Sequence, residues 1–251
     1  MDQHHLISIT GGTIEDIFVI KPGCILISKT EMTSNTHEIF NQLNIDTENN
    51  SEALAEFNSR ITYLSFKNIL QDSKEYNYKM ARMYQHLSVW GSQSATFLLT
   101  GISIETSLEL ISHNEASCSR LTTSRTKAMD NQLYSLNSVE YKNRELLINK
   151  IKMIDSQRKE VFKEIGENKT LKDRELVNML SCGYKATSLT YTMSIKDFHK
   201  LFIGRLSDNG NEEEVRLICE MMCEQLYKLY PMVIRNPGEY YKMGNENKYK
   251  N

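Results

Sequence analysis

Apolar residues recur at intervals of three and four positions in five separate stretches of the chain, and this spacing predicts a fold built mainly of helices. The stretches are residues 51–64, 104–111, 138–165, 194–202 and 212–230. The last stretch shows the pattern most clearly, because five apolar side chains fall on one face and Pro231 follows directly. In the fourth stretch, Ser194 stands three residues before Asp197, which is close to the capping box that starts a helix.

Short runs of apolar and β-branched residues lie outside these stretches and predict a small sheet. They are residues 5–10, 14–21, 24–28, 95–99 and 187–193. The polar stretch 31–50 is expected to be mobile, and the polar end of the chain, 236–251, to be frayed. We therefore expect an α+β fold in which helices dominate, with a small mixed or antiparallel sheet. A single main domain, 24–235, would follow an N-terminal strand extension, 1–23, and precede the polar tail.

The charge balance limits the partners that the chain can have. Its 251 residues include 30 Lys and Arg against 32 Asp and Glu, a formal net charge of −2, which argues against a nucleic-acid coat or a binder of anionic membranes. No apolar run approaches the roughly 18–20 residues that span a bilayer. The five cysteines form no paired framework, so reduced thiols are the expected state. We expect a cytoplasmic globular protein.

Several common catalytic motifs are absent from the sequence: the phosphate-binding G-x-x-x-x-G-K-[ST], the dinucleotide-binding G-x-G-x-x-G and the zinc motif H-E-x-x-H. Cys219 and Cys223 stand four residues apart on a predicted helix, so they could share a metal ion. No histidine or second cysteine pair stands near them, however, and the apolar periodicity explains both as core residues. We therefore expect no metal site.

Two segments carry side chains that suit an anionic ligand. Residues 112–125, SHNEASCSRLTTSR, place one histidine, two arginines and several hydroxyl groups directly after a predicted helix. Arginine binds a phosphate through two parallel hydrogen bonds, whereas the alternative is a solvated loop whose side chains cap one another. On the helix that starts at Ser194, Lys196 and Lys200 share a face. Arg205 lies near its end, where a cation also complements the helix dipole.

The first of these segments resembles the flavin-dependent thymidylate synthases, the ThyX family. That family carries the signature R-H-R-x-x-S-x-x-x-x-S-x-R after a helix. His113 and Ser117 fall on this pattern, Thr122 stands for its second serine, and Arg125 lies one residue out of register. Upstream, residues 86–88, His-Leu-Ser, resemble the family's H-x-[ST] element that contacts the flavin.

The second segment resembles the family's stretch T-x(4)-T-x-N-x-R-x-L-x-x-F-x-x-L-R. Thr187, Thr192 and Arg205 match this stretch, and Phe202 lies one residue from its phenylalanine position. The run Glu214-Val215-Arg216 is then similar to the E-I-R that opens the last helix of the family. In total, the resemblance covers residues 24–235.

The sequence departs from the family pattern at several positions. Ser112 and Asn114 replace the two arginines of R-H-R, and Ser194 and Lys196 replace the asparagine and arginine after the strand. A glutamine that helps to hold the nucleotide is Glu109 here. These changes suggest another uridylate as substrate, or hydroxymethylation, instead of ordinary conversion of dUMP to dTMP. The alternative is a protein that has lost catalysis and acts as a nucleotide-binding or assembly module.

The resemblance implies methyl or hydroxymethyl transfer to carbon 5 of a pyrimidine nucleotide by a homotetramer that binds FAD, with NADPH and methylenetetrahydrofolate as co-substrates. Arg205 would contact the pyrimidine as the catalytic residue, the alternative role being that of a helix-end cation. The implied substrate contacts are Glu109, Arg120, Thr122, Ser124 and Arg125. The implied flavin contacts are His86, Ser88, His113, Ser194, Lys196 and Lys200. For His113, capping of its own helix is the alternative.

Overall fold

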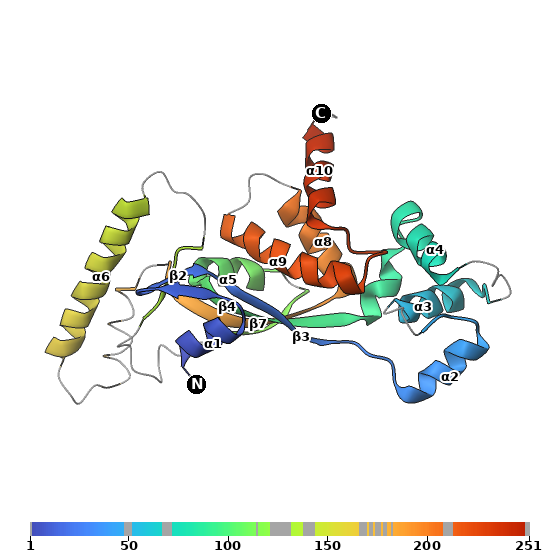
Figure 1. The fold of residues 1–251 in the computed structure, drawn as a ribbon, viewed down its shortest axis with the longest axis horizontal. Helices are drawn as coiled ribbons and strands as arrows, with labels where there is room; N and C mark the ends of the chain where they lie inside the picture. The colour runs from blue at the N-terminus through green and yellow to red at the C-terminus, as the bar shows by residue number, and fades with distance from the viewer. Residues whose placement is uncertain are drawn as a thin grey trace. The chain divides into compact units, whose positions relative to one another are not determined.

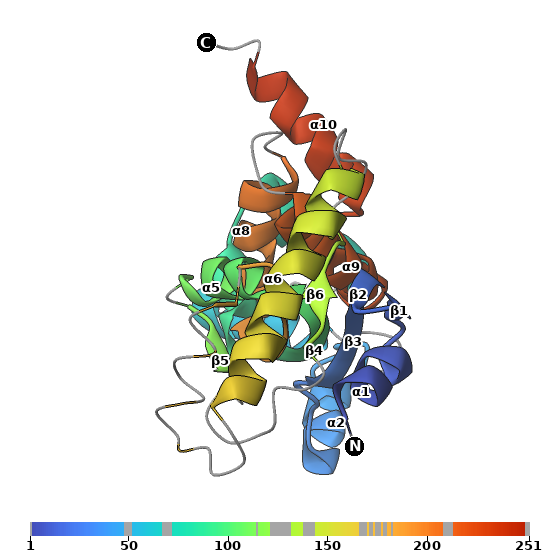
Figure 2. The ribbon, with the colours of Figure 1, turned by 90° about the vertical axis from the view of Figure 1, so that its left-hand side faces the viewer.

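A computed structural model gives the fold of the chain (Figures 1 and 2). The structure describes residues 2–47, 52–66, 72–113, 115–120, 132–137, 144–165, 170, 173, 177, 180–181, 183–207 and 213–248. The chain divides into two compact units. The first takes residues 1–25, 98–114 and 118–190, and the second takes residues 26–97, 115–117 and 191–251. Helices dominate the described residues, so the expected helix-rich fold with small sheets is confirmed.

The strands form two small sheets. The larger has the order β3 (Gly23–Lys29), β4 (Ser94–Ser103), β7 (Ala186–Ser194) and β5 (Ser117–Arg120). The smaller has β1 (Thr13–Glu15), β2 (Phe18–Lys21) and β6 (Tyr134–Ser135), where β2 is antiparallel to β1 and parallel to β6. β4 and β7 confirm the strands expected at 95–99 and 187–193. Each of them ends at a serine that caps the following helix.

The first unit begins with a helix, α1 (Gln3–Ile9), where the sequence pattern predicts a strand over 5–10. Asp2 caps this helix, because its Oδ1 accepts a hydrogen bond from His5 N at 2.9 Å. Thr10 closes it, since the Thr10 hydroxyl donates to Leu6 O at 2.9 Å. Ile7 is fully buried. The strand prediction is therefore wrong here, because hydrogen bonds at both ends outweigh the β preference of an isoleucine-rich run.

The rest of the first unit follows the predicted pattern more closely. The run 14–21 is extended, but a turn at Asp16, whose φ is 57°, divides it between β1 and β2. Two further helices follow, α5 (Ile104–Ile111) and α6 (Arg144–Glu164). They confirm the helices expected over 104–111 and 138–165, although residues 138–143 lie outside the described part of the chain.

The second unit contains the larger set of helical elements. They are α2 (Ser34–Gln42), α3 (Ala53–Tyr63), α4 (Ser73–Tyr78), the π-helical turn η1 (Lys79–Met83), the 3-10 helix η2 (Leu87–Ser92), α8 (Ile195–Leu206), α9 (Glu213–Leu229) and α10 (Pro237–Lys248). α8 packs against α9, η2 and α10, while α3 packs against η2 and α4 (Figure 1). Consequently, α8 is the helix around which this unit is organised.

Two polar stretches of the second unit are helical, contrary to the expectation of a mobile segment and a frayed tail. α2 lies within 31–50, and its Phe40 is buried beside Ile45 and Ala53. α10 lies within 236–251, and its Tyr240 is fully buried. In both stretches one large aromatic side chain supplies the apolar burial that the surrounding polar composition hides.

The buried face of α3 also differs from the predicted one. The spacing predicts Leu54, Phe57, Ile61 and Leu64 on the inner face, yet Ile61 and Leu64 are exposed. Glu56 and Arg60 are buried instead, joined by an ion pair of 2.6 Å, and the Arg60 guanidinium lies 4.2 Å from the Tyr76 ring centroid. Charged side chains can occupy such a face only when they are paired.

Among the described residues, no helix has both the length and the apolar character that crossing a membrane requires.

Candidate functional site

The start of α8 gathers two cations around one carboxylate. The Ser194 Oγ accepts a hydrogen bond from Asp197 N at 3.1 Å and donates one to Asp197 Oδ2 at 2.5 Å, which confirms the expected cap. Lys200 Nζ and Lys196 Nζ lie 3.3 and 3.7 Å from Asp197 Oδ1. The two ammonium groups outweigh the single carboxylate, and the helix dipole adds further positive potential. We call Ser194, Lys196, Asp197 and Lys200 the α8 cluster.

The 3-10 helix η2 lies against the α8 cluster. Ile195 N donates a hydrogen bond to Gln93 O at 2.8 Å, which joins the end of η2 to the start of α8. A Cβ atom placed on Gly91 would lie 4.0 Å from Lys196 Nζ. Ser88 belongs to the same short helix and is exposed. The structure thus brings two of the predicted flavin contacts, Ser88 and Lys196, onto adjoining elements.

His86 lies in an exposed group of aromatic rings. The Tyr63 hydroxyl is 3.3 Å from His86 Nδ1, and the two ring centroids are 5.6 Å apart. The Tyr84 ring centroid is 6.1 Å from that of His86. Between Tyr84 and His86, Gln85 has a φ of 55°, a backbone conformation that residues other than glycine rarely adopt. The sequence pattern misses the two tyrosines as candidate residues, although Tyr84 stands only two positions before the predicted His86.

Arg205 lies on α8 with the α8 cluster but points elsewhere. It follows Lys196 by nine residues, which in an α-helix is about two and a half turns and roughly 14 Å along the axis. Arg205 therefore faces the opposite side of α8 and is half-buried near its end. Because of this phase, Arg205 and the two lysines cannot contact one small anion together. They can act on two separate groups, at the two ends and on the two sides of one helix.

The first unit holds three of the predicted contacts near α5. Arg120 Nη1 donates a hydrogen bond to Ser107 Oγ at 3.2 Å, which joins β5 to α5. Glu109 is half-buried on α5. His113 follows the helix and donates its backbone N–H to Leu110 O at 3.3 Å. Glu109, His113 and Arg120 therefore belong to one strand–helix region of this unit.

The remaining predicted substrate contacts, Thr122, Ser124 and Arg125, lie outside the described residues. Arg120 belongs to the first unit and Arg205 to the second. The predicted convergence of the loop 112–125 with Arg205 around one ligand therefore stays a prediction.

Glu52 is a buried carboxylate that the sequence pattern assigns only to a helix start. It is 3% exposed. Its oxygens accept hydrogen bonds from Trp90 Nε1, Met232 N and Val233 N, each at 3.2 Å. Burial raises the pKa of Glu52 to about 7, although these three donors and the charge of Arg82 act to lower it. Glu52 thus links α3 to η2 and to the turn after α9. Its donors lie up to 181 residues away in the sequence, so no local signal reveals them.

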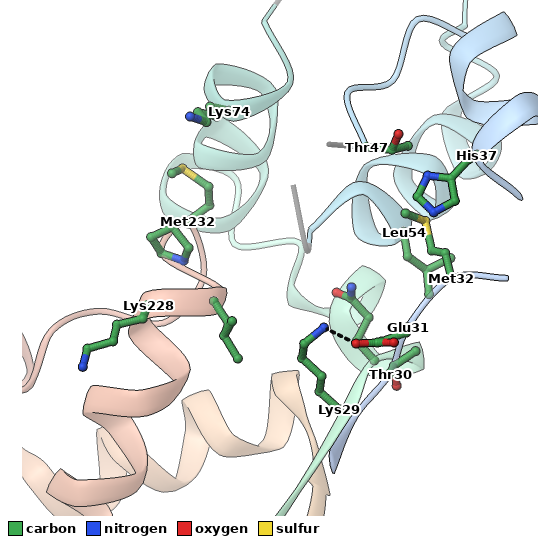
Figure 3. Close-up of a pocket in the computed structure, with 13 residues that line it drawn as sticks. Lys29, Thr30, Glu31, Met32, His37, Thr47, Leu54, Lys74, Lys228 and Met232 are labelled. Atoms are coloured by element: carbon green, nitrogen blue, oxygen red, sulfur yellow. Dashed lines mark hydrogen bonds and ion pairs between the residues drawn. The ribbon is translucent and has the colours of Figure 1, made fainter. Parts of the chain in front are cut away.

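A cavity of about 560 Å³ lies in the second unit, close to this turn (Figure 3). Its polar lining includes Lys29, Glu31, His37 and Lys228, and Lys29 Nζ forms an ion pair with Glu31 at 3.0 Å. In Figure 3, the Lys228 side chain extends away from that pair, so the positive charges of the lining do not converge. None of the predicted site residues that the structure describes lines this cavity.

The two helical cysteines behave as core residues. Cys219 and Cys223 are fully buried on α9, and the Cys223 Sγ donates to Arg235 O at 3.2 Å. Burial, together with nearby negative charges, raises the pKa of the Cys223 thiol far above its usual value. Within the described residues there is no group of three or more His, Cys, Asp or Glu side chains that could hold a metal ion.

Residues 44–232 match the model of the Thy1 family, thymidylate synthase complementing protein. No curated protein matches the chain. The thymidylate synthase ThyX from Helicobacter pylori, solved with FAD and dUMP, is similar with a TM-score of 0.61 and 16% identity, over 87% of this chain and 98% of that one. The UMP/dUMP methylase PolB from Streptomyces cacaoi, bound with 5-Br UMP, is similar with a TM-score of 0.64 and 13% identity, over 90% and 96%. At these identities the likeness is one of fold.

Proposed function

Because the chain belongs to the family of the thymidylate synthase complementing protein, we propose that it transfers a methyl or hydroxymethyl group to carbon 5 of a pyrimidine nucleotide, with FAD as cofactor. The observation that carries this proposal is the α8 cluster beside η2, which places positive charge within the matched residues. The two similar structures support it, since one holds FAD and dUMP and the other is a methylase of UMP and dUMP.

The second unit has the two kinds of surface that FAD requires. Lys196 and Lys200 would hold the diphosphate, with the positive end of α8 adding to their charge. The exposed rings around His86 suit a flat aromatic group, and Ser88 adds a hydroxyl on η2. Gly91 is exposed and has no side chain, so a ligand would be able to approach the backbone of η2 there. Bound FAD, once reduced by NADPH, would supply the hydride that reduces the transferred one-carbon group to a methyl group.

Arg205 would bind the pyrimidine ring. A guanidinium presents five N–H donors in a plane and keeps its charge at any working pH. Directed at a carbonyl oxygen of the ring, it stabilises the negative charge that develops there when carbon 5 accepts the new group. Arg205 lies about two and a half turns after Lys196 and on the opposite side of α8, which leaves room for separate contacts with the nucleotide and with the cofactor.

The first unit would hold the phosphate and the sugar. Arg120 is steadied by Ser107 and can still offer its other N–H groups to a phosphate. We assign the same role to Glu109, Thr122, Ser124 and Arg125, and a place beside the flavin to His113. A homotetramer in the cytoplasm, with NADPH as reductant and methylenetetrahydrofolate as one-carbon donor, completes the proposal.

The proposal is tested with the purified chain. It should carry or take up FAD, seen as flavin absorbance that NADPH bleaches, and it should release tritium from carbon 5 of labelled dUMP or UMP. Comparing the two nucleotides identifies the substrate, and mass spectrometry distinguishes a methylated from a hydroxymethylated product. A chain that binds a nucleotide but neither FAD nor folate, and releases no tritium, would instead be a nucleotide-binding module.

A further inference from the structure

The last helix of the chain lies beyond the residues that match the family model and contacts the helix that carries Lys196, Lys200 and Arg205. Tyr240 of α10 is fully buried, and its hydroxyl lies 2.7 Å from His199 Nδ1 on α8. The Tyr240 ring also packs against Phe202 of α8, with a centroid distance of 5.9 Å. α10 thus touches α8 through a buried hydrogen bond and through ring contacts of Tyr240 with His199 and Phe202.

The chain that leads into α10 is held from neighbouring elements. Arg82 of η1 donates hydrogen bonds to the carbonyl oxygens of Met232, Pro231 and Ile234, at 2.7, 3.1 and 3.2 Å. Two other residues add to this: Glu52, the N-cap of α3, accepts from the backbone N–H groups of Met232 and Val233, and Cys223 of α9 donates to the carbonyl oxygen of Arg235. The turn over 231–235 is therefore fixed before α10 begins.

This turn also contacts the buried hydrogen bond. Arg235 N donates to the Tyr240 hydroxyl oxygen at 3.3 Å. The hydroxyl keeps its own proton and can donate it to His199 Nδ1 when the imidazole is neutral and carries its proton on Nε2. Burial, together with the charges of Arg82 and Arg235, lowers the pKa of His199 to about 4, so the ring is neutral at physiological pH.

The contact acts on the rotation of α8. At 100° per residue, His199 and Phe202 lie on the face toward α10, Lys196 and Lys200 lie on a neighbouring face, and Arg205 lies opposite the lysines. We propose that Tyr240 and His199 are positioning residues. Their hydrogen bond fixes how α8 is turned about its axis, and thereby where the two lysines and Arg205 point. The effect on turnover rests on the proposed function, whereas the effect on α8 does not.

The test compares two tyrosines of the same helix. Tyr240→Phe removes the hydroxyl that contacts α8 and keeps the ring. Tyr241→Phe is the matched control, because the Tyr241 hydroxyl bonds to Glu220 of α9 instead. In Tyr240→Phe, we expect hydrogen exchange of the α8 amides to rise at least fivefold, while exchange of the α9 amides stays near wild type. In Tyr241→Phe, exchange of the α8 amides should stay near wild type. Equal exchange of α8 in both variants would overturn the proposal.

Turnover provides the second readout. In Tyr240→Phe, kcat should fall about tenfold while the KM for the nucleotide changes less than threefold, because a misdirected Arg205 acts chiefly on the transition state. His199→Asn keeps an acceptor close to the position of Nδ1 and should retain most of the activity, whereas His199→Leu should behave like Tyr240→Phe. Loss of activity in proportion to the unfolded fraction would show a merely structural role. If the wild type neither binds flavin nor turns over, the proposed function fails, and hydrogen exchange alone decides the positioning role.

Discussion

Each unit contains a deeply buried carboxylate, Asp155 in the first and Glu52 in the second, and the pKa values of these two groups shift in opposite directions. Asp155 of the first unit lies 2.9 Å from Arg158 and 2.7 Å from Lys159, and it accepts a hydrogen bond from Tyr134 at 3.0 Å. Burial acts to raise the pKa of Asp155, but the bonds from Lys159, Arg158 and Tyr134 outweigh it and hold the pKa below its usual value. The side chains of Asp155 and Glu52 are both almost inaccessible to solvent.

Glu52 of the second unit is buried to the same depth, but its hydrogen-bond donors are neutral N–H groups. Its pKa rises to about 7. The comparison teaches that the partner, and not the depth of burial, decides the charge of a buried carboxylate. Cations also differ in their surroundings: Arg158 is paired within the core, whereas Lys196 and Lys200 are partly exposed on α8.

Removing the cation from Asp155 should have the largest effect. In Arg158→Met the carboxylate stays buried beside only one cation, Lys159, so we expect the free energy of unfolding to fall by about 3–5 kcal/mol. Urea unfolding measures the loss. The control is Lys159→Met, because this partner is 45% exposed and should cost less than about 1 kcal/mol. Equal losses in the two variants would contradict the view that Arg158 compensates the buried charge.

Glu52 should make the folded protein less stable as the pH rises. The folded state binds this proton more tightly than the unfolded chain does, so the stability that Glu52 contributes is fully present below about pH 4.5 and is lost as the pH rises through about 7. The shift corresponds to roughly 3 kcal/mol. Glu52→Gln cannot titrate, so the difference in unfolding free energy between it and the wild type should change across pH 5–8. A constant difference would mean that Glu52 is ionised throughout.

Arg205→Ala tests the cation of the second unit that faces away from the α8 cluster. We expect kcat/KM on the nucleotide to fall about 100-fold, as when one donor to a developing charge is lost, with a Tm within about 2 °C of wild type. The control is Arg216→Ala, which removes another half-buried arginine of this unit, located on α9. If the Tm falls strongly with the activity, Arg205 is a structural cation of the helix end.

Arg120→Ala makes the corresponding test in the first unit, with a smaller expected effect. The KM for the nucleotide should rise about tenfold, more at low than at high salt, while kcat stays within twofold, because a phosphate contact is present in both ground and transition states. Ser107→Ala removes only the hydroxyl that steadies Arg120 and should raise KM about threefold. An affinity that neither change alters would exclude Arg120 from the phosphate site.

The part of the candidate site that could be predicted is the part with a local signal. The spacing of Ser194 and Asp197 alone predicts the start of α8, and the structure confirms their hydrogen bonds. The apolar spacing likewise identifies α9, of which Val215 and Met222 are fully buried. Such signals lie within one or two helical turns, so a single sequence contains them completely.

Other features depend on partners that are distant in the sequence. Glu52 looks like an ordinary first-turn acid until Met232 and Val233 supply their N–H groups. The Glu56–Arg60 pair reverses the expected inner face of α3, because a paired charge can replace an apolar side chain. The polar composition of the last 16 residues likewise hides Tyr240, which is fully buried and anchors α10. In each case tertiary contacts decide the outcome.

The hydrogen bond from the Cys223 thiol to the carbonyl oxygen of Arg235 makes the reactivity of this thiol a measure of local opening. This thiol is fully buried, and its raised pKa keeps it protonated. An alkylating reagent can therefore modify it only when the chain after α9, or α9 itself, opens. The rate at which Cys223 is alkylated, measured by mass spectrometry of its peptide, therefore reports how often this part of the chain opens. Cys219, one helical turn earlier on α9, provides an internal reference for opening of the helix itself.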